Sequence, residues 1–411
     1  LFILDVSLPG MRPDAVFDCV HGVLSTGLSL LFLLILPLSA FIYCSAGKVA
    51  SAGRDKAPSD KSVSGTRKSK VSKPPSDTAP PPPAAGSTAA VDPNDNRTKW
   101  AATTVETSPT TVSKEFVEQL KSYAAPGRTH EAFDANIDKN RYNDIPCYDQ
   151  DRIVLKTTPD YINANYMKAP DGVTYIATQG PLTETRCDFW QMIVQEEVNV
   201  ILQLCKFIEG SESTEKCAEY WPSGEKETTT VLDKFTIKKI DKSEEIAPGT
   251  VKTKLEVKGK TVTRTVQHIF CDAWPDQLAP NDPATIIKIW NYVKANRGAG
   301  PVVVHCSAGV GRTATFIGLS YGVEILKKES ACAADIVKEM RKCRHKAVQT
   351  HIQYGFLHAA LLEMFMQMNL APRSPQSAVF LETFRKQVDR AIEKKEKTER
   401  SAKQRTHTSD G

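Results

Sequence analysis

The sequence of 411 residues is poor in cysteine and lacks several common site motifs. Its 10 cysteines are too few for a disulfide scaffold, and none forms a Cys-x-x-Cys pair or a Cys/His run suited to zinc. Reduced thiols in a cytosolic domain are therefore expected, with no metal and no cofactor. The Gly-x-x-x-x-Gly-Lys-Ser/Thr loop of nucleotide-binding proteins is missing. The lack of a Gly-X-Y period excludes a collagen.

Long apolar runs are also scarce, and the negative mean hydropathy excludes a polytopic membrane protein. One uncharged run, 23–44, is long enough to cross a bilayer. Acidic residues dominate its flank at 1–22, and eight Lys or Arg residues follow it within 48–73. The positive-inside rule therefore predicts a single transmembrane helix at 23–45 with the C-terminal part in the cytoplasm. A signal peptide, or an artefact of how the chain's start was defined, stays open as an alternative; the artefact would leave a cytoplasmic protein.

The rest of the sequence divides by composition into a linker, a folded domain and a tail. Residues 46–113 are dominated by Ser, Thr, Pro, Ala and Lys, which predicts a disordered, basic and Pro-rich linker. Periodic hydrophobicity over 114–370 offers enough chain for one sizeable core. In the basic tail, 371–411, apolar residues recur at every fourth position between 380 and 392, which predicts an amphipathic helix.

Strand-like and helix-like patterns intermix within the folded segment. The predicted strands lie at 198–204, 261–270 and 301–305, and the predicted helices at 283–295, 313–327 and 351–368. An Asp-Pro start and a Thr-x-x-Gln capping box mark the beginnings of two of these helices. The intermixing predicts a single domain of the α/β or α+β class.

The densest chemistry lies at Val304–Thr313, VHCSAGVGRT. A buried strand here runs into a loop with two glycines, and a helix begins near Arg312. Such a turn points consecutive backbone N–H groups into one concavity at the positive end of a helix, which predicts an anion site. Arg312 can add a planar two-point contact to a tetrahedral oxyanion. In that field Cys306 is expected to be a thiolate near neutral pH and a nucleophile toward phosphorus.

A cysteine after a valine run is more commonly an inert core residue. That interpretation explains neither the glycine pair nor the arginine six positions after the cysteine. The segment instead resembles the H-C-x5-R-[ST] signature of the protein tyrosine phosphatases. Six further blocks resemble family motifs and stand in family order between 130 and 360: Lys139–Asp144 (KNRYND), Asp160–Asn165 (DYINAN), Tyr175–Leu182 (YIATQGPL), Lys216–Pro222 (KCAEYWP), Trp274–Asp276 (WPD) and Gln349–Tyr354 (QTHIQY).

The resemblance implies a phosphotyrosine-specific catalytic domain at 114–370, with a twisted mixed sheet flanked by helices. It implies that Cys306 attacks phosphorus while Arg312 and the loop amides of Ser307, Ala308, Gly309, Val310 and Gly311 hold the oxygens. Asp276 would protonate the tyrosyl oxygen and then activate water. Thr313 would hydrogen-bond the departing sulfur, and Gln349 and Gln353 would position the water.

Further roles are implied for residues around the pocket. Tyr142 would stack on the substrate ring, and Asp144 would hold the substrate backbone. Asp276 lies in a mobile loop, 274–280, called the acid loop below. Lys216 would pair with this loop in its closed position, and Trp274 would act in its hinge. Arg341 and Arg344 are expected to brace the loop at 306–311, called the signature loop below. His305 is expected to support this loop by a hydrogen bond. Each of these side chains taken alone is an ordinary core or surface residue, so their assignment depends on the signature.

The acid loop departs from the family pattern WPDxGxP, because Leu278 stands where a glycine is usual. Less backbone freedom predicts slower loop closure. Three functions are therefore weighed: an active tyrosine phosphatase, a phosphotyrosine-binding scaffold without turnover, and a lipid phosphatase. A lipid phosphatase is expected to carry Lys within 307–311, and this segment has none. Retention of Cys306, Arg312 and Asp276 favours the enzyme.

The net charge of +5 lies in the flanks of the domain. Residues 48–73 and 371–411 are both strongly basic, whereas 114–370 is close to neutral. A basic segment directly after the predicted span suits anionic membrane lipid better than nucleic acid. The expected partners are therefore phosphotyrosyl proteins and anionic lipid.

Overall fold

The computed structural model describes residues 91–210, 213–225 and 229–409. The predicted span at 23–45 and the first part of the predicted linker lie outside these ranges. Within them, no helix is both long and apolar enough to cross a membrane.

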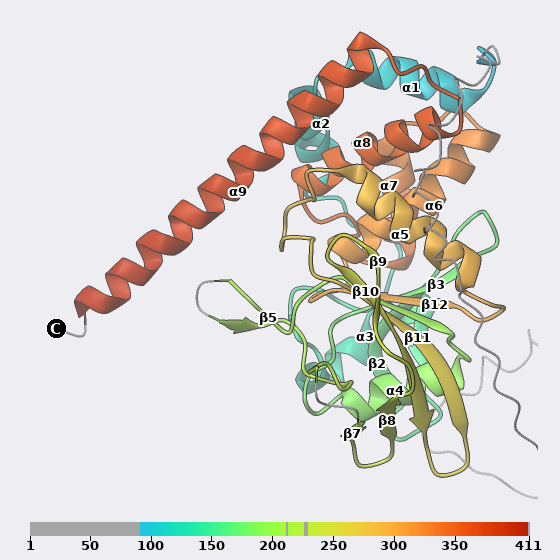
Figure 1. Ribbon diagram of the computed structural model, residues 1–411, viewed down its shortest axis with the longest axis vertical. Helices are drawn as coiled ribbons and strands as arrows, with labels where there is room; N and C mark the ends of the chain where they lie inside the picture. The colour runs from blue at the N-terminus through green and yellow to red at the C-terminus, as the bar shows by residue number, and fades with distance from the viewer. Residues whose placement is uncertain (1–90, 211–212, 226–228, 410–411) are drawn as a thin grey trace, which may run out of the picture. The chain divides into compact units, whose positions relative to one another are not determined.

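A mixed, twisted sheet forms the centre of the described chain (Figure 1). Its strands follow the order β1-β2-β3-β12-β4-β11-β10-β8-β7, with β9 paired to β10. The central strands β3, β12, β4 and β11 run parallel to one another, and the outer pairs are antiparallel. The strands are β1 Arg152–Val154, β2 Tyr161–Lys168, β3 Thr174–Thr178, β4 Val200–Gln203, β7 Thr229–Val231, β8 Thr236–Lys239, β9 Glu244–Ala247, β10 Thr250–Lys258, β11 Thr263–Cys271 and β12 Val302–His305. A separate hairpin pairs β5 (Ile208–Glu209) with β6 (Thr214–Glu215).

The helices α5 to α8 gather on one side of the sheet, with α1 and α2 beside them (Figure 1). The α-helices are α1 Asn96–Glu106, α2 Pro109–Glu115, α3 Glu131–Asp134, α4 Arg186–Gln195, α5 Pro283–Asn296, α6 Arg312–Lys328, α7 Ala333–Cys343, α8 His351–Gln367 and α9 Pro375–Ser409. A π-helical turn at Phe116–Leu120 and 3-10 turns at Ile137–Lys139 and Asp149–Asp151 join them. The mixed sheet between helices confirms the predicted class, and α5, α6 and α8 lie where helices were expected.

Close packing of α6 on α8 fixes the helix that follows the signature loop. At Gly322 on α6, a Cβ atom would lie 2.6 Å from Leu361 of α8. The small residue therefore lets the two helices approach closely, which holds α6 against α8.

The predicted linker is wrong for its last part, because α1 and α2 cover most of 96–113 and pack on the domain. Asp95 and Ser108 cap α1 and α2 by accepting backbone N–H bonds, which supplies the helix starts. Trp100 is 9% exposed and stacks on His358 at 5.5 Å between ring centroids. One large aromatic residue anchors a segment whose average composition is that of a linker.

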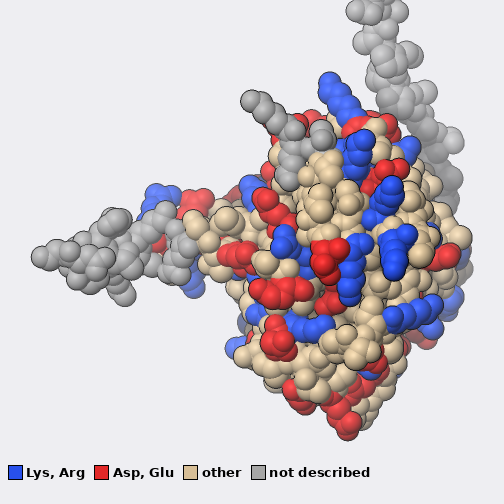
Figure 2. Space-filling model, turned by 90° about the horizontal axis from the view of Figure 1, so that it is seen from below, with Lys and Arg blue, Asp and Glu red and all other residues tan. Residues whose placement is uncertain are grey.

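The helix predicted in the basic tail is confirmed as α9. Phe380, Phe384 and Val388 are at most 2% exposed, so the side of α9 that carries every fourth residue packs on the domain. The long helix then runs on past the helical layer (Figure 1). Seen from below, the face in Figure 2 intersperses Lys and Arg with Asp and Glu, so it presents no field of a single sign.

Candidate active site

The signature loop connects β12 to α6 at the centre of the sheet. All four β12 residues, Val302–His305, are buried between parallel neighbours, which explains the continuous valine run. Gly309 has φ +70°, and a Cβ there would lie 2.2 Å from the Thr178 carbonyl oxygen. Only glycine fits that position, so the loop conformation is built into the sequence. Cys306 at the start of the loop is 3% exposed.

The loop closes on the N-terminus of α6, which begins at Arg312. Gly311 occupies the N-cap position and offers no side-chain acceptor to the first N–H groups. No acidic residue stands in the first turn of α6. The positive end of the helix dipole therefore stays available to an anion held by the loop.

Arg344 braces the signature loop directly, as predicted. Its guanidinium donates to the carbonyl oxygens of Ala308 at 3.0 Å and Gly309 at 3.3 Å, and to Asn165 Oδ1 at 2.8 Å. These bonds turn carbonyl oxygens away from the pocket, which leaves the amide groups to face it.

Arg341, which was also expected to brace this loop, does not contact it directly. Arg341 donates to the carbonyls of Leu120, Tyr123, Ala347 and Val348 instead. It reaches the signature loop only through Val348, whose N–H bonds the Val310 carbonyl at 2.9 Å.

His305 sits in a buried hydrogen-bond chain behind Cys306. Its Nε2 lies 2.8 Å from the Tyr220 hydroxyl, which also lies 2.7 Å from His268 Nε2. Its Nδ1 lies 3.2 Å from the Cys306 carbonyl oxygen. Both ring nitrogens are thus engaged by protein groups, which fits the predicted supporting role and leaves neither for proton transfer at the pocket.

Arg312 is buried and held by a carboxylate that the sequence did not identify. Its two terminal nitrogens bond the two oxygens of Glu209 on β5 at 2.7 and 3.0 Å. Burial opposes the charge of Arg312, but the hydrogen bond and charge of Glu209, together with Cys306 and Cys205, outweigh it and raise the pKa of the guanidinium. The fork geometry fixes the plane in which Arg312 meets an oxyanion.

Asp276 faces the signature loop, so the acid loop is in its closed position. The carboxylate pairs with Lys216 Nζ and with Arg312 Nη2, both at 3.1 Å. Burial opposes ionisation of Asp276, but Arg312 and Lys216 together outweigh it, so the pKa of Asp276 lies below its ordinary value. Asp276 is therefore ionised in this arrangement and shares Arg312 with Glu209.

Leu278 is compatible with this closed position. Its side chain is 9% exposed and its carbonyl accepts the Trp274 indole N–H at 2.9 Å, an internal bond that ties the ends of the loop. The neighbouring Gln277 carries the unusual conformation instead, with φ +62°. Thr350 donates to the Gln277 carbonyl at 3.0 Å and holds it there.

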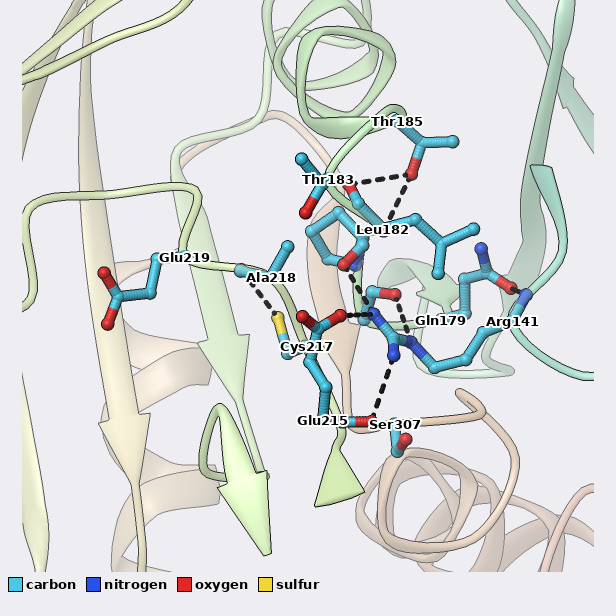
Figure 3. A network of polar contacts seen from close by, with 12 residues as sticks. Arg141, Gln179, Leu182, Thr183, Thr185, Glu215, Cys217, Ala218, Glu219 and Ser307 are labelled. Carbon is cyan, nitrogen blue, oxygen red and sulfur yellow. Dashed lines mark hydrogen bonds and ion pairs between the residues drawn. The ribbon is translucent and has the colours of Figure 1, made fainter. Parts of the chain in front are cut away.

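Tyr142 forms one wall of the pocket, and its hydroxyl lies 2.8 Å from Ser307 Oγ. The preceding residue, Arg141, anchors this wall (Figure 3). Its side chain bonds the carbonyls of Gly180, Pro181 and Glu215 at 2.8–3.1 Å and the Glu215 carboxylate at 3.1 Å. Arg141 is a positioning residue that the motif contained but to which no role had been assigned.

Asp144 lies at the rim and is largely exposed. Lys346 Nζ bonds both its carboxylate, at 2.8 Å, and its backbone carbonyl, at 3.0 Å. This bond lowers the pKa of Asp144, so the carboxylate is ionised and oriented at neutral pH.

Two glutamines close the pocket from the start of α8. Gln353 donates its N–H to the Thr350 hydroxyl at 3.2 Å, which confirms half of the predicted capping box. Its side-chain oxygen accepts the Gln349 N–H instead of the cap residue's own. A Cβ on Gly311 would lie 2.8 Å from Gln353 Nε2 and 3.0 Å from Gln349 Oε1, so both amides press on the signature loop.

These residues enclose a cavity of about 120 Å³. Of the predicted residues, Trp274, His305, Gly309, Val310, Thr313, Arg341 and Arg344 do not line it, and Thr313 is fully buried with a hydroxyl that has no hydrogen-bond partner among the described residues. The lining comprises Tyr142, Asp144, Ile145, Lys216, Asp276, Gln277, Cys306, Ser307, Ala308, Gly311, Arg312, Gln349 and Gln353. No group of three or more His, Cys, Asp or Glu side chains suited to a metal ion occurs in the described ranges.

Comparisons with known proteins agree with this geometry. Residues 136–363 match the protein-tyrosine phosphatase family. Human tyrosine-protein phosphatase non-receptor type 7 is 36% identical over 278 residues, which cover 64% of this chain and 74% of that protein. Human receptor-type tyrosine-protein phosphatase C is 40% identical over 240 residues, 56% of this chain and 18% of that protein.

A solved structure also matches, that of the catalytic domain of human protein tyrosine phosphatase non-receptor type 18. It is 31% identical, with a TM-score of 0.54, and the match covers 66% of this chain and 100% of that domain. The chain therefore belongs to the protein-tyrosine phosphatase family and is a phosphoric monoester hydrolase.

Proposed function

We propose that this protein hydrolyses phosphotyrosine in proteins through a cysteinyl-phosphate on Cys306. One observation carries the proposal: a thiol, a buried guanidinium and a carboxyl group, those of Cys306, Arg312 and Asp276, converge on one small cavity. This set supplies a nucleophile, an oxyanion partner and an acid for one substitution at phosphorus.

In the first step, the Cys306 sulfur forms a bond to phosphorus as the bond to the tyrosyl oxygen breaks. The equatorial oxygens lie against the amides of the signature loop and the guanidinium of Arg312. Glu209 keeps that guanidinium in plane, so its alignment requires no rearrangement during the reaction.

Asp276 donates its proton to the leaving tyrosyl oxygen. In the free protein, burial raises the pKa of Asp276, but Arg312 and Lys216 lower it further than burial raises it, so Asp276 is ionised. A phosphate dianion bound at Arg312 replaces the Asp276 carboxylate as the partner of that cation. The negative charge of the phosphate also repels the negative charge of the carboxylate. Both effects raise the pKa of Asp276 toward the protonated state that the step needs.

In the second step, water attacks the cysteinyl-phosphate and the sulfur leaves as a thiolate. Gln349 and Gln353 lie on the cavity wall next to Gly311, where they can orient that water. Asp276, now ionised, accepts the proton. The unpartnered hydroxyl of Thr313 is the group proposed to stabilise the departing sulfur.

The substrate class follows from the wall and rim. Tyr142 supplies an aromatic face, and the ion pair of Asp144 with Lys346 places an oriented carboxylate where a peptide backbone can donate to it. The structure of human protein tyrosine phosphatase non-receptor type 18 in complex with HER2 phosphopeptides supports phosphotyrosyl peptides as ligands of this domain type.

The scaffold alternative depended on Leu278 hindering loop closure. Leu278 packs in the body of the domain when Asp276 pairs with Lys216 and Arg312, so the closed position accommodates this side chain, which weighs against that alternative. The enzyme is therefore the function that the geometry favours.

We also propose a membrane tether, from the uncharged run at 23–45 and the basic segment 48–73 that follows it. Alkaline carbonate extraction of the full chain tests this. A tethered protein stays in the pellet, whereas release into the supernatant contradicts the span.

The enzymatic proposal is tested by incubating the full chain with a phosphotyrosyl peptide in the absence of added metal. Phosphate release is expected for the wild type and not for Cys306→Ser. If the wild type released phosphate no faster than Cys306→Ser, the enzymatic function would be contradicted, and a phosphotyrosine-binding scaffold would become the favoured function.

A further inference from the structure

The C-terminal helix α9 contacts the acid loop at the residue that carries the chemistry. Lys395 Nζ donates to the backbone carbonyl oxygen of Asp276 at 2.8 Å, across 119 positions of sequence. Lys395 is partly buried although its neighbours Lys394 and Lys397 are exposed. The lysine is thus turned inward toward the loop and is not part of the solvated face of the helix.

A second polar contact joins the same helix to the far end of the acid loop. Asn281 Nδ2 donates to Asp389 Oδ1 at 2.8 Å. Asp389 and Lys395 are six positions apart on α9, and their partners Asn281 and Asp276 are five positions apart along the loop. The loop therefore runs beside α9 and is attached to it at two points.

An aromatic series continues this attachment to the hinge. The Trp274 ring lies 5.1 Å from Phe356 of α8, and Phe356 lies 6.3 Å from Phe384 of α9, both between ring centroids. Phe384 is 1% exposed. Displacement of α9 would remove one wall of the cluster in which the hinge tryptophan packs.

We propose that Lys395 is a positioning residue for the phosphatase reaction, which holds the closed acid loop from α9 through the Asp276 carbonyl. The inference rests on the proposed role of Asp276 as the acid. It assigns the basic tail a direct part in turnover, beyond docking on the domain.

The need for an external bond follows from the loop itself. Gln277, directly after the acid, has φ +62°, a conformation that non-glycine residues adopt only when surrounding contacts hold them there. Two hydrogen bonds hold the backbone on either side of the Gln277 Cα atom. Lys395 donates to the Asp276 carbonyl, and Thr350 donates to the Gln277 carbonyl.

The bond matters most after substrate binds. A phosphate group at Arg312 takes that cation away from Asp276, and protonation of the carboxyl group weakens its pairing with Lys216 as well. The Lys395 bond goes to the backbone, so it does not compete with the proton that the carboxyl group must carry and release. It can therefore hold Asp276 in place throughout both steps.

The test compares two aryl phosphates with the full chain, one with a good leaving group (p-nitrophenyl phosphate) and one with a poor leaving group (phenyl phosphate). Misplacing the acid slows the poor leaving group more, because its departure depends more strongly on protonation. Lys395→Met keeps the apolar stem of the side chain and removes its donor. It is expected to lower kcat/KM, which reports the step in which the aryl group leaves, about threefold to tenfold for phenyl phosphate, the range of one such hydrogen bond, with a smaller fall for p-nitrophenyl phosphate.

Two matched variants and a stability check complete the design. Lys395→Arg retains a donor of similar reach and is expected to restore the leaving-group ratio, while Lys397→Met, on the exposed side of α9, leaves it at the wild-type value. Thermal unfolding of each variant shows whether the fold is intact. An equal fall for both substrates, no fall, or failure of the arginine variant to rescue overturns the inference.

Asp276→Asn separates this inference from the function on which it rests. If Asp276→Asn does not change the leaving-group ratio, the proposed acid is wrong. If Asp276→Asn changes the ratio and Lys395→Met does not, the acid stands and the role of Lys395 fails.

Discussion

The signature loop and the acid loop meet at one pocket, but different kinds of contact hold them. The signature loop is buried, and its shape depends on Gly309 and on bonds from Arg344 to its own carbonyls. The acid loop is held by side chains from elsewhere, Lys216, Thr350 and Lys395. The first is preformed as an anion site, whereas the second has contacts that can be exchanged one at a time.

This difference suits the two tasks. A phosphate cradle works best when its dipoles are fixed before the substrate arrives. An acid must approach the leaving oxygen and later let the product depart, so its loop needs a closed position of limited stability. Variants of the signature loop should therefore act on chemistry and folding together, and variants of the acid loop on turnover alone.

The largest expected effect on turnover within the acid loop belongs to Asp276→Asn. Loss of the acid is expected to lower kcat for a phosphotyrosyl peptide about 10²- to 10⁴-fold, the range of general acid–base catalysis. The peptide should still bind, because the signature loop is unchanged. Steady-state kinetics and calorimetric binding measure the two quantities. A loss of binding as large as the loss of rate would show that the two loops are not separable in this way.

Two alanine substitutions at glycines with positive φ, one inside the signature loop and one outside it, test how that loop is held. Gly309→Ala places a Cβ 2.2 Å from the Thr178 carbonyl at φ +70°, so we expect a fall of about 3 kcal/mol or more in the free energy of unfolding. Gly172→Ala is the matched control, with φ +82° and no atom within 4 Å of the Cβ, and should cost about 1 kcal/mol. Denaturant unfolding gives both values, and equal losses would mean that the Thr178 contact does not shape the loop.

The smallest expected effect is a shift of the pH profile in Lys216→Met. Burial raises the pKa of Asp276, and Arg312 and Lys216 lower it. Removing one cation therefore raises this pKa and keeps the acid protonated to higher pH. The alkaline limb of kcat/KM, which reports the free enzyme, should move to higher pH. A limb that stays in place, or moves to lower pH, would contradict the assigned ion pair.

Sequence reasoning recovered the signature loop because its determinants are local. The strand, the glycines, Cys306 and Arg312 lie within a dozen positions, and the helix that completes the anion site follows at once. The family motifs then supplied Asp276 and Tyr142, which the fold brings to the same cavity.

Long-range partners were out of reach of the same reasoning. Glu209 pairs with Arg312 across 103 positions and comes from a hairpin whose two strands have two residues each, too short to carry a periodic pattern. Lys395 was one lysine among many in a basic tail. Arg341 was expected to brace the signature loop, but it donates to carbonyls outside that loop and reaches it only through Val348. Residues 96–113 were assigned to a linker because one buried tryptophan carries little weight in a composition.

The central claim is that phosphate passes through Cys306, and rapid acid quenching during turnover of a radiophosphate-labelled phosphotyrosyl peptide tests it most directly. We expect label bound covalently to the full chain, located by peptide mapping on the segment that contains Cys306, and lost in Cys306→Ser. Turnover at the wild-type rate with no label on the protein, or label that persists in Cys306→Ser, would contradict the account.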